Sequence, residues 1–446
     1  MIRFNGYSDL HRHLYGSVRH SDFLEWHHRN QFDISSWSRS YENRFGSGGL
    51  LLETIPQDVY QLHLGRDRGW GDFDVKYALL NVASRFACEP RTVAEAVPII
   101  EELHFFLSRQ KEYQKHKGVK FSETRLHLPY RYGPEVNRYL LRELLQVLQL
   151  LSDSDITMTL ALTLSRDNPF IVWNILKQVL REPLGIACTA VDFCGDELSS
   201  EPGELENFAR DLHTFNAENP NRSVAFLIHA GEILQDGSLE SSIRRVHTAA
   251  KLGAHRIGHA TVLGVDPTKI PADWRWEKAS SRCAQLRYDL IEYEALCKAG
   301  VVLNRQELED ELNDLNEIPH DACVRIKPFD VEDIRARQRH VSQYLAGRGT
   351  VVECCPTSNI IIGGLASFKD HPIAALLRSG IRVVLATDDE GLFDTDLQTE
   401  FSRLWSADLL TEADVTDLEQ NSRDCLSTLL CGRSMSPLKE LTNPLC

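Results

Sequence analysis

The sequence of 446 residues predicts an α/β fold, a closed (β/α)8 TIM barrel with a large insertion between strands six and seven. Two observations predict this fold. Short apolar segments alternate along the chain with segments of helical periodicity, and this alternation implies that the strands pair in parallel. Eight such strands can be counted, and this number favours a closed barrel over the alternative, an open doubly wound sheet.

The elements follow one another in a regular order. After the first strand, residues 18–75 are expected to be irregular because they are rich in Trp, Arg, Asn and Gly. Helical periodicity then appears, most clearly in the leucine stripe of residues 136–151. Helices are expected around 73–115, 136–151, 171–181, 205–215, 243–252 and 372–379. Strands are expected at 7–12, 122–128, 156–164, 186–192, 224–229, 255–259, 350–354 and 381–387.

One connection is much longer than the others. Roughly ninety residues separate strand six from strand seven, whereas a usual connection takes far fewer. We treat residues 1–446 as a single barrel domain, with residues 263–349 as an insertion that forms either a lid or an oligomer contact. Within it, a helix is expected at 331–346, and the acidic run at 307–317 is expected to be a solvated face. Residues 299–304 could alternatively be a barrel strand.

The composition narrows the possible functions. A net charge of −15 argues against general nucleic-acid binding. No apolar run reaches the ~18–20 residues of a membrane-spanning helix, and the first residues lack the apolar stretch of a signal peptide. A cytoplasmic protein without membrane association is therefore expected. The eleven cysteines form no CxxC pair, so most are expected to be buried thiols.

Polar side chains gather where the predicted strands end. These ends meet at one face of a parallel barrel, so the side chains would come together there. Three histidines and a carboxylate can bind a divalent metal ion. Each group also has a structural alternative: His259 could be a hydrogen-bonded loop residue, Asp388 a helix N-cap, and Glu232 a surface charge. The groups are His11 and His13, residues 192–197, His229 and Glu232, His259, and residues 387–389.

Five short segments occur in a distinctive order. They are His11-x-His13, His229-Ala-Gly-Glu232, Arg256-Ile-Gly-His259, Cys355-Pro-Thr-Ser-Asn359 and Thr387-Asp388-Asp389. In combination they resemble the adenosine/AMP deaminase family of the metal-dependent amidohydrolase superfamily, and the loop around Gly195 is similar to that family's segment after strand four. The resemblance runs from residue 5 to residue 430, outside 30–70 and the insertion. We expect residues 355–359 to be structural support without substrate contact.

The resemblance implies a zinc enzyme. One Zn²⁺ per chain would be bound by His11, His13, His229 and Asp388. Zinc lowers the pKa of a bound water molecule, so hydroxide forms at neutral pH, and this hydroxide would attack C6 of an adenine ring. The other zinc deaminase architecture requires a P-C-x-x-C motif, which this sequence lacks.

The resemblance also implies substrate contacts. Glu232 would donate a proton to ring N1, which requires a carboxylic acid kept protonated by burial or by the substrate. His259 would orient or deprotonate the water, and Asp388 would take part in catalysis through the metal. Asp389 would hydrogen-bond N7. The backbone N–H of Gly195 would meet N3, a close approach that a residue without a side chain permits.

Two positions depart from the family pattern. The family usually has an aspartate that reads the 5′ hydroxyl of the sugar, and here Tyr15 occupies that position. Losing this carboxylate removes a repulsion against 5′-phosphates, and Tyr15 could donate a hydrogen bond to phosphate or simply pack. Arg12, Arg19 and the arginines of residues 38–68 are further candidate phosphate contacts. Ala260 replaces a common glycine, a change expected to be tolerated.

The resemblance therefore implies a deaminase that converts adenosine, deoxyadenosine or their 5′-phosphates to the inosine counterpart with release of ammonia. One alternative is an amidohydrolase acting on another amino-substituted ring. Another is a deaminase-like barrel that serves mainly in assembly or binding. The presence of Glu232 and both aspartates argues against the latter, since a non-catalytic barrel has no chemical need for them. A homo-oligomer could form through the insertion.

Overall fold

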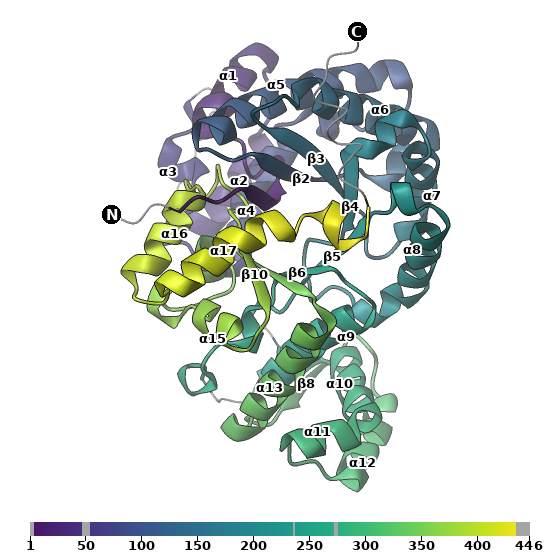
Figure 1. Cartoon of the computed structure of the whole chain (residues 1–446), viewed down its shortest axis with the longest axis vertical. Coiled ribbons are helices and arrows are strands. Elements are labelled where there is room, and N and C mark those ends of the chain that lie inside the picture. Colours follow the sequence, from purple (N-terminus) through teal and green to yellow (C-terminus); the bar gives the residue numbers. More distant parts are fainter. Residues whose placement is uncertain (1–3, 47–53, 235–236, 272–274, 434–446) are drawn as a thin grey trace.

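The computed structural model describes residues 4–46, 54–234, 237–271 and 275–433, and its centre is an eight-stranded parallel sheet (Figure 1). The strand order is β1-β2-β3-β4-β5-β6-β9-β10. These strands are β1 (Ser8–His13), β2 (Phe121–His127), β3 (Thr157–Thr163), β4 (Cys188–Asp192), β5 (Ala225–Ala230), β6 (Arg256–His259), β9 (Val351–Cys354) and β10 (Arg382–Leu385). The (β/α)8 barrel is confirmed, and every predicted strand overlaps an observed one.

The sheet closes where its first and last strands meet. A parallel bridge joins Arg12 to Asp388. The amide of Asp388 donates to the carbonyl of His11 at 2.8 Å, and the amide of His13 donates to the carbonyl of Asp388 at 3.1 Å. The barrel seam therefore runs through the residues that the sequence singles out.

Helices surround the barrel, and each buries the apolar stripe that its spacing predicts. In α6, for example, Leu140, Leu144 and Leu148 are buried. Helices α5, α6, α7 and α8 pack against one another in succession. The outer helices are α4 (Gly69–Val82), α5 (Val93–His116), α6 (Pro134–Leu151), α7 (Pro169–Leu180), α8 (Glu206–Glu218), α9 (Leu239–Lys251), α15 (Ile373–Arg378) and α16 (Leu397–Ser406).

The amino ends of the strands are covered by the last described part of the chain. Helix α17 (Glu412–Asp424) packs against β1 and β10, and α18 (Ser427–Leu430) packs against β4 and β5. Arg433 donates hydrogen bonds to the carbonyls of Ile186 and Cys188, at the start of β4. In Figure 1, α17 crosses in front of the strands. The opposite face, at the carboxyl ends, is left for the site.

The stretch over residues 18–75 is mostly helical, so the prediction of irregular structure there is wrong. Its described part contains α1 (His20–Asn30), α2 (Ser35–Phe45), α3 (Gln57–Tyr60) and the start of α4, while residues 47–53 lie outside the described residues. Aromatic side chains bury these helices in place of an aliphatic stripe. Phe23 and Trp26 are buried in α1, and Trp37 and Tyr41 are buried in α2. Spacings of three and four residues place each pair on one helix face.

The long connection from β6 to β9 holds several elements of its own. They are β7 (Arg275–Lys278), α10 (Ala279–Ile291), α11 (Tyr293–Ala299), α12 (Arg305–Asn316), β8 (Cys323–Ile326) and α13 (Val331–Arg348). β7 and β8 form a two-stranded antiparallel sheet. In Figure 1, α10, α11 and α12 extend away from the barrel.

Three expectations for this connection can be compared with the structure. The helix expected at 331–346 is confirmed as α13, which packs against the barrel helix α9. The acidic run falls mostly in α12, where it is largely exposed. Residues 299–304 do not form a barrel strand: α11 ends at Gly300, whose φ of 102° suits a glycine C-cap.

Within the residues that the structure describes, no helix combines the length and apolar character needed to cross a membrane.

Candidate active site and metal centre

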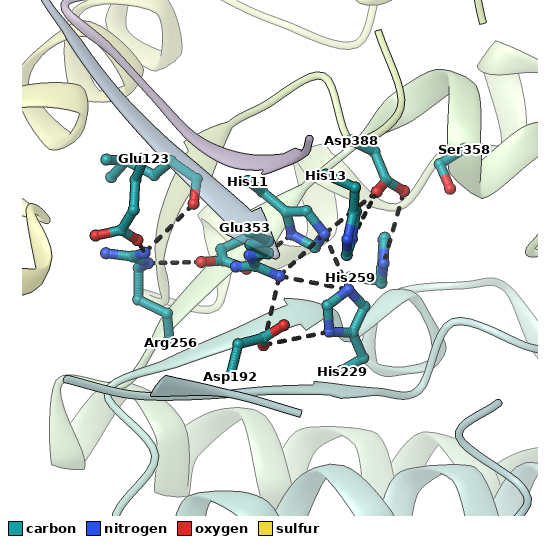
Figure 2. Close-up of polar contacts among 12 residues, drawn as sticks. His11, His13, Glu123, Asp192, His229, Arg256, His259, Glu353, Ser358 and Asp388 are labelled. Carbon is teal, nitrogen blue, oxygen red and sulfur yellow. Dashed lines mark hydrogen bonds and ion pairs between the residues drawn. The ribbon is translucent and has the colours of Figure 1, made fainter. Parts of the chain in front are cut away.

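Five predicted side chains lie together at the carboxyl ends of the strands (Figure 2). His11 and His13 end β1, His229 lies in β5, His259 ends β6 and Asp388 follows β10. The ring centroid of His11 lies 5.3 Å from that of His13, 4.6 Å from that of His229 and 5.0 Å from that of His259. The structure thus brings these residues together from four strands that are distant in sequence.

Two of the imidazoles turn the same ring nitrogen toward each other. Nε2 of His11 and Nε2 of His229 are 3.0 Å apart. Nδ1 of His11 lies 2.8 Å from Oε2 of Glu353, and Nδ1 of His229 lies 3.4 Å from Oδ1 of Asp192. A carboxylate near Nδ1 favours the ring proton on that nitrogen and leaves Nε2 unprotonated, so that Nε2 can accept a hydrogen bond or bind a metal ion. Burial lowers the pKa of His229 to about 4, so this ring is neutral at pH 7.

Asp388 completes the group of possible ligands. Its Oδ1 lies 3.4 Å from Nε2 of His11 and 3.2 Å from Nε2 of His13. Burial alone would raise the pKa of Asp388, but the adjacent His11 and the hydrogen bonds with His11 and His13 outweigh burial and hold it well below its usual value. The φ angles of Asp388 (62°) and His259 (73°) are left-handed. Such strain, roughly 1–3 kcal/mol per residue, is characteristic of functional sites.

The donor set fits a divalent transition metal ion. One atom each from His11, His13 and Asp388 lies within 4.8 Å of the other two, and the same holds for His11, His229 and His259. Ligand atoms around a tetrahedral zinc ion lie about 3.3 Å apart. The contacts of 3.0–3.4 Å that His11 Nε2 makes with His229 and Asp388 approach this spacing. Imidazole nitrogen with one carboxylate oxygen is also the ligand chemistry that zinc accepts.

A buried arginine lies directly beside these ligands. Nη1 of Arg125 is 3.1 Å from Nε2 of His11 and 3.3 Å from Nε2 of His229. Its Nη2 donates to Oε2 of Glu353 at 2.5 Å, and Nη1 lies 3.6 Å from Oδ1 of Asp192. Arg125 therefore holds the two carboxylates that in turn orient the two imidazoles.

A second arginine extends this network toward the barrel interior. Nε of Arg256 donates to Oε1 of Glu353 at 2.6 Å, and its Nη2 pairs with Glu123. All of these side chains are buried. The two guanidinium groups, of Arg125 and Arg256, pair with three carboxylates, those of Glu123, Asp192 and Glu353. Asp388 adds a fourth carboxylate beside the histidines. The excess negative charge is what a bound divalent cation would neutralise.

Glu232 lies beside His259, on the loop that follows β5. Its Oε2 is 3.4 Å from Nε2 of His259, and its Oε1 accepts a hydrogen bond from Oγ of Ser358 at 2.8 Å. Burial and the negative charge of Asp388 raise the pKa of Glu232 well above its usual value. A buried carboxylic acid that keeps its proton at neutral pH can act as a general acid.

A chain of hydrogen bonds fixes the proton position on His259. The amide of Ile373 donates to Nδ1 of His371 at 3.2 Å, so His371 carries its proton on Nε2, which donates to Oδ1 of Asn359 at 3.1 Å. The amide group of Asn359 then donates to Nδ1 of His259 at 3.1 Å. His259 must therefore carry its own proton on Nε2, facing Glu232 and Asp388. Burial lowers the pKa of His371 to about 3, so it stays neutral.

The loop that carries Glu232 is held by another carboxylate. Glu197, from the segment after β4, accepts hydrogen bonds from the amides of Gly231, Glu232 and Ile233 at 2.6, 3.0 and 2.7 Å. Gly195 lies in the same segment with a φ of 83°, a left-handed conformation that favours glycine. The two predicted segments after β4 and β5 are thereby joined.

A cavity of 380 Å³ opens from His13. Its lining includes four aromatic side chains and Cys194, which is next to Gly195. The aromatic residues are Tyr15, Tyr77, Phe86 and Tyr132. A purine ring could stack against such side chains.

Asp389 lies close to the backbone of the first motif. A Cβ atom on Gly16 would come within 1.6 Å of its Oδ1, so only glycine at position 16 leaves room for it. Oδ1 is buried and has no hydrogen-bond partner among the described residues. Burial and the charge of Asp388 raise the pKa of Asp389 well above its usual value. A neutral Asp389 has a proton available for a hydrogen bond to an acceptor.

The hydroxyl of Tyr15 is already engaged. It donates to Oε1 of the buried Glu102 at 2.5 Å, and the indole of Trp26 donates to Oε2 at 2.8 Å. Burial raises the pKa of Glu102 to about 7. Tyr15 lines the cavity, but its proton faces Glu102, so it can offer a ligand mainly an acceptor.

Two of the candidate phosphate contacts are also engaged. Arg12 is buried and pairs with Glu390 at 3.0 Å. Arg19 lies 3.6 Å from Glu390 and stacks 3.4 Å from the ring centre of Tyr113. Neither arginine lines the cavity.

Several residues of the site could not be singled out from the sequence. The expectation that residues 355–359 are only structural support is too narrow, because Ser358 and Asn359 contact Glu232 and His259. The alternation Glu123-x-Arg125 in β2 could have served as a signal, since two charged residues that share one face of a buried strand require partners. No sequence pattern around His371 indicates that it belongs to the site.

The comparisons with curated proteins match short stretches of the chain. Residues 325–426 match the family model described as adenosine deaminase. Over 55 residues the chain is 46% identical to an aminodeoxyfutalosine deaminase of Acidothermus cellulolyticus, which covers 12% of this chain and 15% of that protein. Over 85 residues it is 36% identical to an adenine deaminase of Rhizobium leguminosarum bv. trifolii, which covers 19% and 25%. The matched stretches thus span a quarter or less of these relatives.

Solved structures match over nearly the whole chain. The structure of Arabidopsis ADAL complexed with IMP gives a TM-score of 0.56 at 17% identity and covers 98% of this chain and 95% of that one. An amidohydrolase of Burkholderia ambifaria with bound Zn gives a TM-score of 0.52 at 14% identity and covers 94% and 85%. At these identities the likeness establishes the barrel fold.

Proposed function

The chain belongs to the adenosine deaminase family of the amidohydrolase superfamily, and on that premise we propose that it is a zinc-dependent hydrolytic deaminase. Its substrate would be an adenine nucleoside or nucleotide, converted to the inosine counterpart with release of ammonia. The observation that carries the proposal is the position of the buried Glu232, whose Oε2 lies 3.4 Å from Nε2 of His259, next to the group of histidines and Asp388. A general acid beside a set of metal donors is what hydrolytic removal of a ring amine requires.

The proposed metal is one Zn²⁺ ion, held by His11, His13, His229 and Asp388. A bound zinc ion lowers the pKa of a water molecule to near neutrality and so supplies a nucleophile. The excess of carboxylates over guanidinium groups around Arg125 and Arg256 supports a cation here. The zinc in the Burkholderia amidohydrolase is in keeping with this choice.

Glu232 supplies the proton for the ring. Its neutral carboxyl would donate to N1 of the purine, which withdraws electrons from C6 and favours addition of water there. The hydrogen bond from Ser358 orients the carboxyl group. Departure of the C6 amine as ammonia then restores the ring.

His259 orients and stabilises rather than acting first as a base. Because Asn359 donates to its Nδ1, its proton is on Nε2 and can be donated to oxygen at the reacting carbon. Asp389 would donate its proton to N7, and the backbone N–H of Gly195 would meet N3. These contacts would place the ring with C6 toward the histidines.

The substrate panel is the direct test. Loss of absorbance is followed with the zinc-loaded chain and adenosine, deoxyadenosine, AMP, dAMP, ATP and free adenine in turn. We expect turnover of at least one nucleoside or nucleotide. If none of the five nucleosides and nucleotides is turned over, the proposed function is wrong.

A neutral substrate is the second candidate, and one observation favours it. Arg12 and Arg19 are paired with Glu390, and Tyr15 gives its proton to Glu102. Arg131, which lines the cavity, is paired with Glu89 at 3.0 Å. A cavity with few free cations favours adenine or a nucleoside over a phosphate ester, whereas the ADAL complex with IMP favours a nucleotide. The panel separates the two by the ratio of kcat/KM for AMP and adenosine.

We also propose that the segment 263–349 forms an oligomer contact rather than a lid. Large apolar side chains are exposed on it: Trp276, Ile291, Val302 and Ile318 are 61%, 78%, 82% and 36% exposed. An apolar patch formed by such side chains would be typical of a protein–protein contact. Helices α10–α12 also extend away from the barrel in Figure 1.

A further inference from the structure

A second group of metal-ligating side chains lies outside the active site, where the insertion meets the barrel helices. His247 comes from α9, His340 from α13, and Glu292 from the junction of α10 and α11. One donor atom of each side chain lies within 4.8 Å of the donor atoms of the other two. Three separate helical segments therefore converge on one point.

Two ring nitrogens in this group lack partners. Nε2 of His247 and Nε2 of His340 are both buried, and neither has a hydrogen-bond partner within the described part of the chain. His247 is only 1% exposed. A buried polar atom without a partner costs about 1–3 kcal/mol. Two such atoms within one group of possible metal ligands point to a cation that both could bind.

The other nitrogen of His247 is held in the manner of metal-binding histidines. Its Nδ1 lies 2.7 Å from the hydroxyl oxygen of Tyr288, in α10. When Nδ1 carries the proton and donates it to Tyr288, the lone pair of Nε2 is free to bind a cation. A hydrogen bond of this kind fixes the ring orientation and makes the ligand more basic.

Glu292 supplies the negative charge. Its Oε1 is paired with the ammonium group of Lys251, which leaves Oε2 for a cation. The positive charge of Lys251 therefore competes with a metal ion for this carboxylate. The carboxylate is 15% exposed, which leaves a route for an ion from solvent.

Aromatic packing alone does not explain why His247 and His340 are histidines. The rings of His247 and His340 meet edge to face at 5.4 Å, and Tyr344 packs against His247 at 4.5 Å. Apolar aromatic residues would pack equally well and would leave no nitrogen unsatisfied. Two histidines facing a carboxylate are explained by a cation.

We propose that His247, His340 and Glu292 bind a second divalent metal ion of the zinc type, with water as the fourth ligand. Two imidazoles and a carboxylate form a common zinc ligand set. The ligand atoms of tetrahedral zinc lie about 3.3 Å apart, so small side-chain rotations would bring the three atoms into place. The ion would join α10 and α11 of the insertion to α9 and α13. This site goes beyond the proposed deaminase function and does not depend on it.

Metal stoichiometry tests the proposal. The full chain is loaded with excess Zn²⁺, freed of loose ions by gel filtration, and its zinc per chain is measured by mass spectrometry. His340→Asn should bind one ion fewer than the unaltered chain. His104→Asn, which changes an exposed histidine of α5, is the matched control and should bind as many as the unaltered chain. Equal zinc content in the His340→Asn and unaltered chains would overturn the proposal.

The difference in zinc content between the unaltered and His340→Asn chains does not depend on whether the active site binds zinc. If the active site holds zinc, the expected values are two ions and one. If the proposed function fails because the active site holds none, they are one and zero. His340→Asn should also keep its deaminase activity, because His340 touches neither the cavity nor the catalytic residues.

A second measurement does not depend on how the His340 variant folds. Lys251→Met removes the charge that competes for Glu292, so the dissociation constant of the second ion, measured by equilibrium dialysis, should fall at least threefold. Glu292→Gln should raise it at least tenfold. A dissociation constant that neither substitution changes would show that the carboxylate is not a ligand, and the proposal would be wrong.

Discussion

The side-chain amide of Asn359 donates a hydrogen bond to Nδ1 of His259 at 3.1 Å, and this contact fixes the proton of His259 on the opposite nitrogen. The orientation of Asn359 is itself fixed by His371, whose Nδ1 accepts from the backbone amide of Ile373. The backbone amide of Ile373 thus determines, through the side chains of His371 and Asn359, that the proton of His259 is on Nε2.

Asn359→Asp should lower kcat. A carboxylate at this position would accept from Nδ1 of His259, which moves the ring proton away from Nε2. The loss should be about 10–100-fold, as for other residues that orient catalytic groups, with unchanged zinc content. Steady-state kinetics and metal analysis check it. Asn421→Asp is the matched control. Asn421, in α17, donates a hydrogen bond to the carbonyl of Val383 in β10, so this substitution should lower stability without changing kcat. A kcat equal to the unaltered enzyme would contradict the proton placement.

Glu232→Gln should abolish most of the activity. Glutamine keeps the shape and the contact with Ser358 but has no acidic proton to give to the ring. We expect kcat to fall about 10²–10⁴-fold, with zinc content and melting temperature retained. Glu135→Gln, at an exposed position of α6, is the control. Near-normal turnover by the Glu232 variant would mean that another group is the acid.

The same substitution should change how stability depends on pH. Burial and the charge of Asp388 raise the pKa of Glu232 well above its usual value of 4.5, so above that pH the folded chain holds a proton that the unfolded chain has released. Stability contributed by this group is therefore lost as pH rises through the folded-state pKa. Glutamine does not titrate. In metal-free protein, the melting temperature of Glu232→Gln relative to the unaltered chain should therefore rise as the pH increases above 4.5. A constant difference would contradict the raised pKa.

Tyr15→Phe should reduce stability more than it changes substrate preference. The substitution leaves Oε1 of the buried Glu102 without the hydroxyl donor, which should cost about 1–3 kcal/mol of unfolding free energy. The ratio of kcat/KM for AMP to that for adenosine should change less than threefold, because the Tyr15 proton faces Glu102. Denaturant unfolding and the substrate panel measure the two effects. A large selective loss for AMP would show that Tyr15 reads the phosphate.

Charged residues on the insertion should reduce self-association. Ile291→Asp and Val302→Asp place a carboxylate where a large apolar side chain is exposed, which is unfavourable in a packed interface. Sedimentation should show a smaller assembly than for the unaltered chain. Leu150→Asp, at a 70% exposed position of the barrel helix α6, is the matched control and should leave the size unchanged. A monomer in all four samples would exclude the oligomer contact.

The strands were predictable because each is a short buried run that ends in polar residues, and the two signals reinforce each other. The helices α1 and α2 were not, because Phe23, Trp26, Trp37 and Tyr41 bury them without an aliphatic stripe. Aromatic residues spaced three or four apart in a polar segment are a weak pattern that loops also show.

The candidate site likewise contains residues that could be predicted from the sequence and residues that could not. Residues at strand ends, such as His11 and Asp388, could be predicted because barrel geometry brings those ends together. The residues that orient them could not, because their roles arise from contacts between segments far apart in the chain. Glu353 reaches His11 across 342 residues, and Glu102 reaches Tyr15 across 87. Sequence spacing carries no information about such pairs.

The seam at Arg12 and Asp388 makes the catalytic centre a late product of folding. Asp388 is held by the backbone of His11 and His13, almost the full length of the chain away. Contacts of such long sequence separation form slowly, because a large loop must close before they stabilise anything. A nascent or partly folded chain would thus have its other six strands in place and still lack the assembled ligand set. Metal uptake that depends on Asp388 would then report that both ends of the barrel have joined.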